Sequence, residues 1–115
     1  MKHAALTDFD RGVIVGLLIT QGSFGGDGRT PHITLKMHVR HESLLRWLHG
    51  RFPNTKLYGP YQHGSRHFYQ WTARGRALVE DVLPVLEAVS DLDAHAAERI
   101  AQMRANYATA IERLS

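Results

Sequence analysis

Residues 32–40 carry side chains that could recognise a polyanion. Every second position is basic or hydrogen-bonding, and these positions are His32, Thr34, Lys36, His38 and Arg40. Arginine and lysine pair with phosphates or with guanine edges, and threonine can contact the methyl group of thymine. The residues between them are apolar. The chemistry that this spacing favours is non-covalent recognition of a nucleic acid by one face of a strand.

More side chains of the same kind follow or precede this segment. They are Arg29, Lys56, Tyr58, Gln62, Arg66 and Gln70. Glutamine can read adenine through two hydrogen bonds. An exposed strand residue often has no ligand, and we expect that of some members of this set. The whole set, together with the polar residues of 32–40, contains no acid. It therefore predicts one binding surface.

The distribution of charge supports this interpretation. The net charge is only +3, but residues 29–72 hold seven Lys and Arg against one acid, Glu42, and six of the eight histidines. From residue 73 onward, five Arg stand against seven Asp and Glu. This pattern is typical of a polyanion-binding face on one side of a fold. A solvated basic surface without a ligand is the alternative.

Composition excludes several other classes of protein. The 115 residues suit a single domain, 1–115, and the absence of cysteine excludes disulfides, thiolate chemistry and Cys-based zinc sites. No apolar run approaches a membrane span, and the N-terminal residues lack a signal-peptide layout, so we expect a cytoplasmic protein, associated with the nucleoid if it binds DNA. The histidines, such as His38, His41 and His49 or the pair His63 and His67, lack the spacing of a zinc site, so we expect no metal.

The elements that must position these side chains alternate between helices and strands. Helices are expected at about 9–20, 42–52, 76–89 and 92–114, and strands at 23–25, 32–40, 56–62 and 66–72. Asp8 or Asp10 should cap the first helix, and Pro84 should kink the third. The apolar stripe of the last helix should join the core, with a dimer contact as the alternative; it comprises Ile100, Met103, Tyr107, Ile111 and Leu114.

The strands should form a sheet with one covered and one open side, because apolar and polar residues alternate along them. Tyr69 and Trp71 should face the core, which leaves Arg66, Phe68, Gln70 and Thr72 on the open side. The same alternation places Lys56, Tyr58 and Gln62 there, although Gly59-Pro60 interrupts that strand.

Two glycines one turn apart, Gly12 and Gly16, should leave a smooth strip along the first helix. Such a strip lets a second backbone approach closely. With Ile19 and Gly22 it predicts a homodimer interface. Packing of the strip onto the protein's own core is the alternative.

Segment 14–22, Ile-Val-Gly-Leu-Leu-Ile-Thr-Gln-Gly, resembles the signature helix of LAGLIDADG homing endonucleases. Ser-Phe follows the final glycine, and the order of elements over residues 9 to about 89 is similar to the αββαββα order of that family. The resemblance implies an α+β fold with an antiparallel four-stranded saddle sheet that lies along DNA, here with an extra C-terminal helix at about 92–114. It also implies that two copies of the signature helix pack together.

In that family an acid before the final glycine binds the catalytic metal, and here the position is Gln21. Magnesium prefers anionic oxygen ligands, which an amide does not supply. Asp8 and Asp10 should lie about 15–20 Å away along the helix. Asp27 is expected on a turn beyond the strand start, too far from the end of the helix to replace the missing acid.

The resemblance therefore implies a homodimer that binds double-stranded DNA, near-palindromic in sequence, without cutting it and without a cofactor. Transcription regulation is one role that such relatives have. The alternatives are an active or recently decayed endonuclease that needs Mg²⁺, an RNA-binding maturase-like protein, and a protein-interaction module whose basic face has no ligand.

Overall fold

The computed structural model describes residues 5–114, apart from the side chain of Ser90, so residues 1–4 and 115 of the predicted domain lie outside the described part. In chain order the elements are α1 (Asp8–Gln21), β1 (Ser23–Gly26), β2 (Pro31–His38), the 3₁₀ helix η1 (Val39–His41), α2 (Glu42–Arg51), β3 (Lys56–His63), β4 (Arg66–Arg74), the π-helical segment η2 (Ala77–Val82), α3 (Leu83–Leu86), α4 (Val89–Leu92), α5 (Ala94–Asn106) and α6 (Ala108–Leu114).

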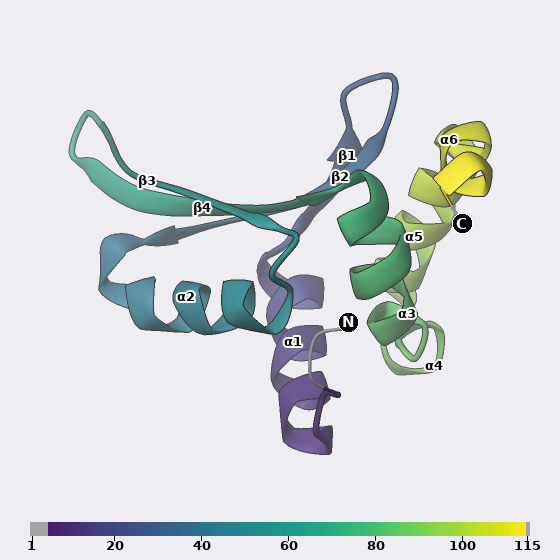
Figure 1. Cartoon of the computed structure of the whole chain (residues 1–115), viewed down its shortest axis with the longest axis horizontal. Helices are drawn as coiled ribbons and strands as arrows, with labels where there is room; N and C mark the ends of the chain where they lie inside the picture. The colour runs from purple at the N-terminus through teal and green to yellow at the C-terminus, as the bar shows by residue number, and fades with distance from the viewer. Residues whose placement is uncertain (1–4, 115) are drawn as a thin grey trace.

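The four strands form one antiparallel sheet in the order β1-β2-β4-β3. It is curved, and both hairpin ends rise away from α1 and α2 (Figure 1). Helix α2 lies beneath β3 and β4, α1 descends from the β1 side, and α5 and α6, which we call the C-terminal helices, stand beside β1 (Figure 1). This arrangement confirms the predicted α+β class and the αββαββα order.

The core lies between the sheet and the helices beneath it. Ile33 and Leu35 of β2 and Trp71 of β4 are fully buried and pack with α1, α2 and α3. The indole N–H of Trp71 donates to the Thr55 hydroxyl at 2.9 Å, and that hydroxyl donates to the Phe52 carbonyl at 2.6 Å. The buried polar groups are therefore paired, and they fix the connection from α2 to β3.

The cap of α1 differs from the prediction. Thr7 is the N-cap residue: its hydroxyl accepts from the Asp10 N–H at 3.0 Å, and the Asp10 carboxylate accepts from the Thr7 N–H at 3.2 Å. This reciprocal pair is a capping box. Asp10 therefore contributes from inside the first turn, and Asp8 does not cap the helix.

Other boundaries differ as well. Strand β2 ends at His38, because residues 39–41 turn into a 3₁₀ helix. The third predicted helix starts with π-type bonding, in which the Leu83 N–H reaches the Leu78 carbonyl, just before Pro84 removes a backbone donor. The last predicted helix is broken at Tyr107 into α5 and α6. Among the described residues, no helix combines the length and apolarity that a bilayer span requires.

Candidate nucleic-acid interface

One face of the sheet has no helix of the described chain over it, and we call it the open face. Residues paired across neighbouring strands share a face. The register pairs Lys36 with Gln70, His38 with Phe68 and Lys56 with Thr72. The open face therefore comprises Ser23 and Gly25 of β1, His32, Thr34, Lys36 and His38 of β2, Lys56, Tyr58, Tyr61 and His63 of β3, and Arg66, Phe68, Gln70, Thr72 and Arg74 of β4.

The prediction that Gln62 lies on the open side of the sheet is wrong. The register shifts between Tyr58 and Tyr61, and beyond the shift Tyr61 pairs with Phe68 while Gln62 pairs with His67. Gln62 therefore points to the opposite face, and Tyr61 and His63 take its place. Gly59 allows this irregularity, since it adopts a φ of +120° and lies against the backbone of β4. The Gly-Pro pair in the sequence was the available signal.

Two more predicted residues lie off the strands. Arg40 is exposed in η1 rather than on β2, since the strand ends at His38. Arg29 is exposed in the turn between β1 and β2, at the rim of the sheet. Arg74 pairs with His32 on the open face. It was not among the predicted residues, because the fourth strand was expected to end at residue 72.

The open face combines cations with aromatic rings. Its strands carry Lys36, Lys56, Arg66 and Arg74, and its members include no Asp or Glu. The Lys36 Nζ lies 5.7 Å from the centroid of the Phe68 ring, and the Tyr61 and Phe68 centroids are 5.5 Å apart. Tyr58 and Tyr61 are each 44% exposed, which makes their rings available to a ligand.

The surroundings of His38 favour its neutral form. Its Nδ1 accepts from the Arg40 backbone N–H at 3.0 Å and from the Arg40 Nε at 3.2 Å. Partial desolvation, and then the charges of Arg40, His67 and His41, lower the pKa of His38. With Nδ1 accepting, the neutral ring carries its proton on Nε2. His38 is thus a hydrogen-bond donor that needs no positive charge.

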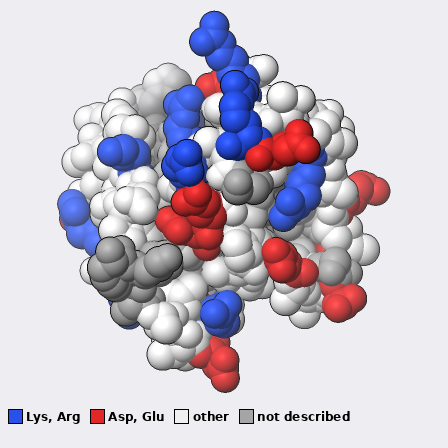
Figure 2. Space-filling view, turned by 45° about the vertical axis from the view of Figure 1, so that its right-hand side comes forward, with Lys and Arg blue, Asp and Glu red and all other residues white. Residues whose placement is uncertain are grey.

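The acidic side chains lie outside the open face. Asp27, in the β1–β2 turn, binds Arg74 at 2.8 Å. The side of the molecule turned forward in Figure 2 shows basic and acidic side chains interspersed, with neither sign forming a continuous patch. This side carries the helices that follow β4, and from residue 73 onward the sequence has seven Asp and Glu against five Arg. On the strands, Arg74 is paired with Asp27, whereas Lys36, Lys56 and Arg66 are in none of the ion pairs of the described residues.

Helix α1 exposes its glycines. Gly12 and Gly16 are exposed, and apart from the neighbouring residues and backbone of α1 itself no described atom lies within 4 Å of a Cβ built on either. The alternative that this strip packs on the protein's own core is therefore wrong. Ile19 is half-buried against the core, and a Cβ on Gly22 would lie 2.5 Å from the Leu18 carbonyl oxygen, so Gly22 has a role within its own chain.

Gln21 is the last residue of α1 and is exposed beside the start of β1. Its amide is neutral, whereas a hydrolytic magnesium centre needs carboxylates. Among residues 5–114, no group of three or more His, Asp or Glu side chains is placed to hold a metal ion. The donors at this position do not fit the divalent metal of an endonuclease.

The curved antiparallel sheet on α1 and α2 defines the class to which this architecture belongs: it is the fold of the LAGLIDADG homing endonucleases. A chain of the solved structure "Group I Intron-encoded Homing Endonuclease I-CeuI Complexed With DNA" matches with a TM-score of 0.72 and 19% sequence identity. The match covers 90% of this chain and 56% of that chain. No protein-family model matches the sequence, and no curated protein matches it either.

Proposed function

We propose that this protein binds double-stranded DNA through the open face, as a homodimer, and does not cut it. The observation that carries the proposal is the open face itself: Lys36, Lys56 and Arg66, which are in none of the ion pairs of residues 5–114, stand with several hydrogen-bond donors on one uncovered sheet surface. The fourth cation of this face, Arg74, is paired with Asp27. The similar solved structure is of a homing endonuclease complexed with DNA. Phosphate contacts from Lys36, Lys56 and Arg66 would position the duplex.

Base recognition would fall to the hydrogen-bonding members of the open face. Gln70 can bond adenine with two hydrogen bonds, and Thr34 can contact a thymine methyl group. His32 and His38 can each donate to an acceptor on guanine or on phosphate. Arg29, just before β2, and Arg40, just after it, would extend the contacts beyond the strands.

The proposed dimer joins two α1 helices along Gly12 and Gly16. The argument is geometric, because these exposed glycines leave open space where a partner helix could approach closely. Ile19, half-buried at the side of the strip, would pack at its edge. A two-fold dimer presents the same half-surface twice, so the preferred duplex should be close to palindromic.

The absence of cleavage is proposed from Gln21. Two such glutamines across a dimer would remove two negative charges from the position where a metal would have to bind. We therefore expect no Mg²⁺ cofactor. Binding without cleavage would suit a regulatory role on DNA in the cytoplasm, in association with the nucleoid.

Selection of bound duplexes from a random pool tests the binding proposal. We expect enrichment of a near-palindromic site whose affinity falls as salt rises. Failure to enrich any duplex, with binding that does not depend on salt, would contradict the proposal and favour an interaction module.

Incubation of the selected duplex with Mg²⁺ or Mn²⁺ tests the absence of cleavage. We expect intact DNA from the wild type, and the variant Gln21→Asp shows whether the position alone limits hydrolysis. Nicking by the wild type would establish the alternative of a working endonuclease.

Structured RNA is the second candidate ligand, and one observation favours it. Tyr58 and Tyr61 are exposed on the open face, where rings can stack on unpaired bases as they do on other RNA-binding sheets. Competition between the selected duplex and structured RNA at one salt concentration separates the two. We expect the duplex to compete better.

A further inference from the structure

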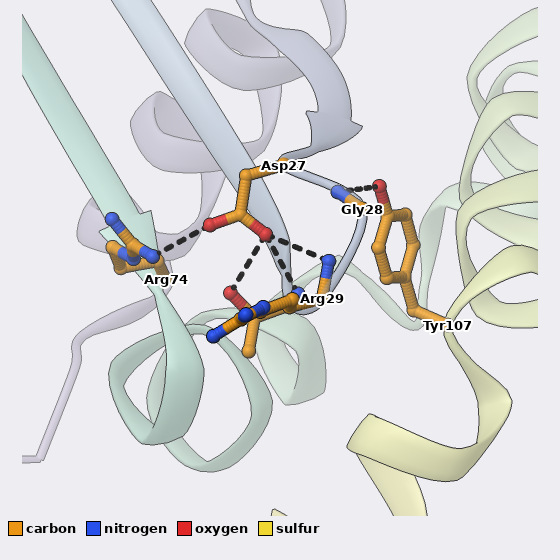
Figure 3. A network of polar contacts seen from close by, with 6 residues as sticks. Asp27, Gly28, Arg29, Arg74 and Tyr107 are labelled. Carbon is orange, nitrogen blue, oxygen red and sulfur yellow. Dashed lines mark hydrogen bonds and ion pairs between the residues drawn. The ribbon is translucent and has the colours of Figure 1, made fainter.

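The β1–β2 turn, residues 27–30, is held from three sides. Figure 3 shows Asp27 of this turn between Arg74 of β4 and the backbone of the turn, and Tyr107 on the opposite side against Gly28. These contacts join segments that lie 47 and 79 residues apart in the chain. The turn carries Arg29, one of the proposed DNA contacts, at the rim of the open face.

Asp27 organises the turn from within. One carboxylate oxygen accepts the backbone N–H groups of Arg29 and Thr30, each at 2.9 Å, and the other accepts from Arg74 at 2.8 Å. The bonds from Thr30 and Arg29, with the charge of Arg74, lower the pKa of Asp27 to about 2. The carboxylate is therefore ionised at neutral pH, and its hydrogen bonds are of the stronger, charge-assisted kind.

Tyr107 closes the turn from outside. Its hydroxyl accepts the Gly28 N–H at 3.1 Å, and a Cβ on Gly26 would overlap the Tyr107 ring. Gly28 has a φ of +91°, which leaves its N–H directed at the tyrosine. Nearby, the Arg99 guanidinium of α5 lies 5.5 Å from the centroid of the Phe24 ring of β1. The interruption of the helix between α5 and α6 thus occurs at Tyr107, the residue whose hydroxyl reaches the β1–β2 turn.

The two arginines beside Asp27 differ in their remaining charge. Arg74 forms an ion pair with Asp27. The Arg29 side chain is exposed and is in none of the ion pairs of residues 5–114. At the other end of the sheet, the β3–β4 turn has a weaker hold: the Gln62 amide reaches the Gly64 carbonyl at 3.5 Å. One rim of the open face is therefore braced from the C-terminal helices.

We propose that Tyr107 is a positioning residue for nucleic-acid binding: it orders the β1–β2 turn before binding, so that Arg29 meets a phosphate without first paying the entropy of ordering the turn. The C-terminal helices, which follow the αββαββα order, would on this account form part of the binding apparatus. The inference rests on the proposed binding of DNA by the open face.

A double-mutant cycle tests this role with the full chain and the selected duplex. The variants are Tyr107→Phe, which removes only the hydroxyl, Arg29→Ala, and both together. We expect Tyr107→Phe to weaken binding by about 3- to 10-fold, the range of one lost hydrogen bond. Its effect on the salt slope should be small, because no charge is removed, whereas Arg29→Ala should lower the slope by about one per subunit.

The cycle separates positioning from a general structural role. If Tyr107 acts through Arg29, Tyr107→Phe should have almost no effect on binding once Arg29 is alanine. Thr109→Ala, an exposed change in α6, is the control and should leave affinity unchanged. Equal losses from Tyr107→Phe in both backgrounds would overturn the inference while leaving DNA binding intact.

A second measurement needs no nucleic acid. The Gly28 amide should exchange its hydrogen slowly in the free wild-type protein, and faster in Tyr107→Phe. Rapid exchange at Gly28 in the wild type would overturn the inference even if the cycle could not be completed. If the wild type shows no salt-dependent affinity for any duplex, the proposed function fails, and this inference fails with it.

Discussion

Lys36 lies near the middle of the open face, where β2 pairs with β4. It is exposed, its neighbour across the strands is Gln70, and its ammonium group lies 5.7 Å from the centroid of the Phe68 ring. This contact holds the long side chain close to the sheet. A cation held over the centre of a concave surface is well placed to reach a phosphate.

Lys36→Ala should weaken duplex binding and lower the salt slope by about one per subunit, because one phosphate contact is lost. Measurement of the dissociation constant across a salt series tests this. Arg113→Ala removes the same charge from α6, away from the sheet, and should leave the slope almost unchanged. Equal losses in the two variants would show that net charge, and not the open face, governs binding.

Asp27 should make the free energy of unfolding depend on pH in the acidic range. Its pKa is lowered from 3.8 to about 2 in the folded protein, so the unfolded chain takes up the proton first as pH falls. The stabilisation by the carboxylate is complete above about pH 4 and is lost toward pH 2.

Asp27→Asn should therefore lower the free energy of unfolding at pH 7, and its difference from the wild type should shrink as pH falls below about 4. Urea unfolding at a series of pH values measures this difference. A difference that stays constant down to pH 3 would mean that the ionised carboxylate is not what holds the turn.

At the scale of elements, α1 has two different sides. Ile14, Val15 and Leu18 are buried in the core, while Gly12 and Gly16 face outward. Glycine costs about 1 kcal/mol in a helix relative to alanine, so two exposed glycines weaken the helix without any benefit within the chain. A partner helix against them would supply the benefit.

Gly16→Val should break the dimer, because its branched side chain fills the space that a partner helix would need. Molecular mass in solution, measured by light scattering, should fall to that of one chain. Gly50→Val in α2 is the matched control, since Gly50 is likewise exposed with no described atom within 4 Å of a built Cβ. A mass that Gly16→Val leaves unchanged at that of two chains would rule out this interface.

The elements also show which features a sequence can predict. The alternation along β2 fixed its open side correctly, because a period of two is a local property. The side to which Gln62 points depends on how many residues the irregularity at Gly59 absorbs, and only pairing with β4 decides that. The break at Tyr107 is not marked by Gly or Pro: its contact is to Gly28, far away in sequence.

For the whole molecule, the arrangement separates two kinds of surface. The side of the molecule that carries the helices after β4 shows mixed charges (Figures 1 and 2). The open face carries Lys36, Lys56, Arg66 and Arg74 and no Asp or Glu. Concentrated positive charge on one concave side attracts a polyanion at long range. The sequence showed this separation as a basic segment, but only the fold places that segment on one surface.

The measurement that tests this account most directly is the affinity of the wild type for its selected duplex across a salt series, with the stoichiometry determined at each point. The account predicts two chains per duplex and a logarithm of the association constant that falls linearly with the logarithm of salt, by about 0.9 for each phosphate contacted. Binding that is independent of salt, or no binding to any duplex, would contradict it.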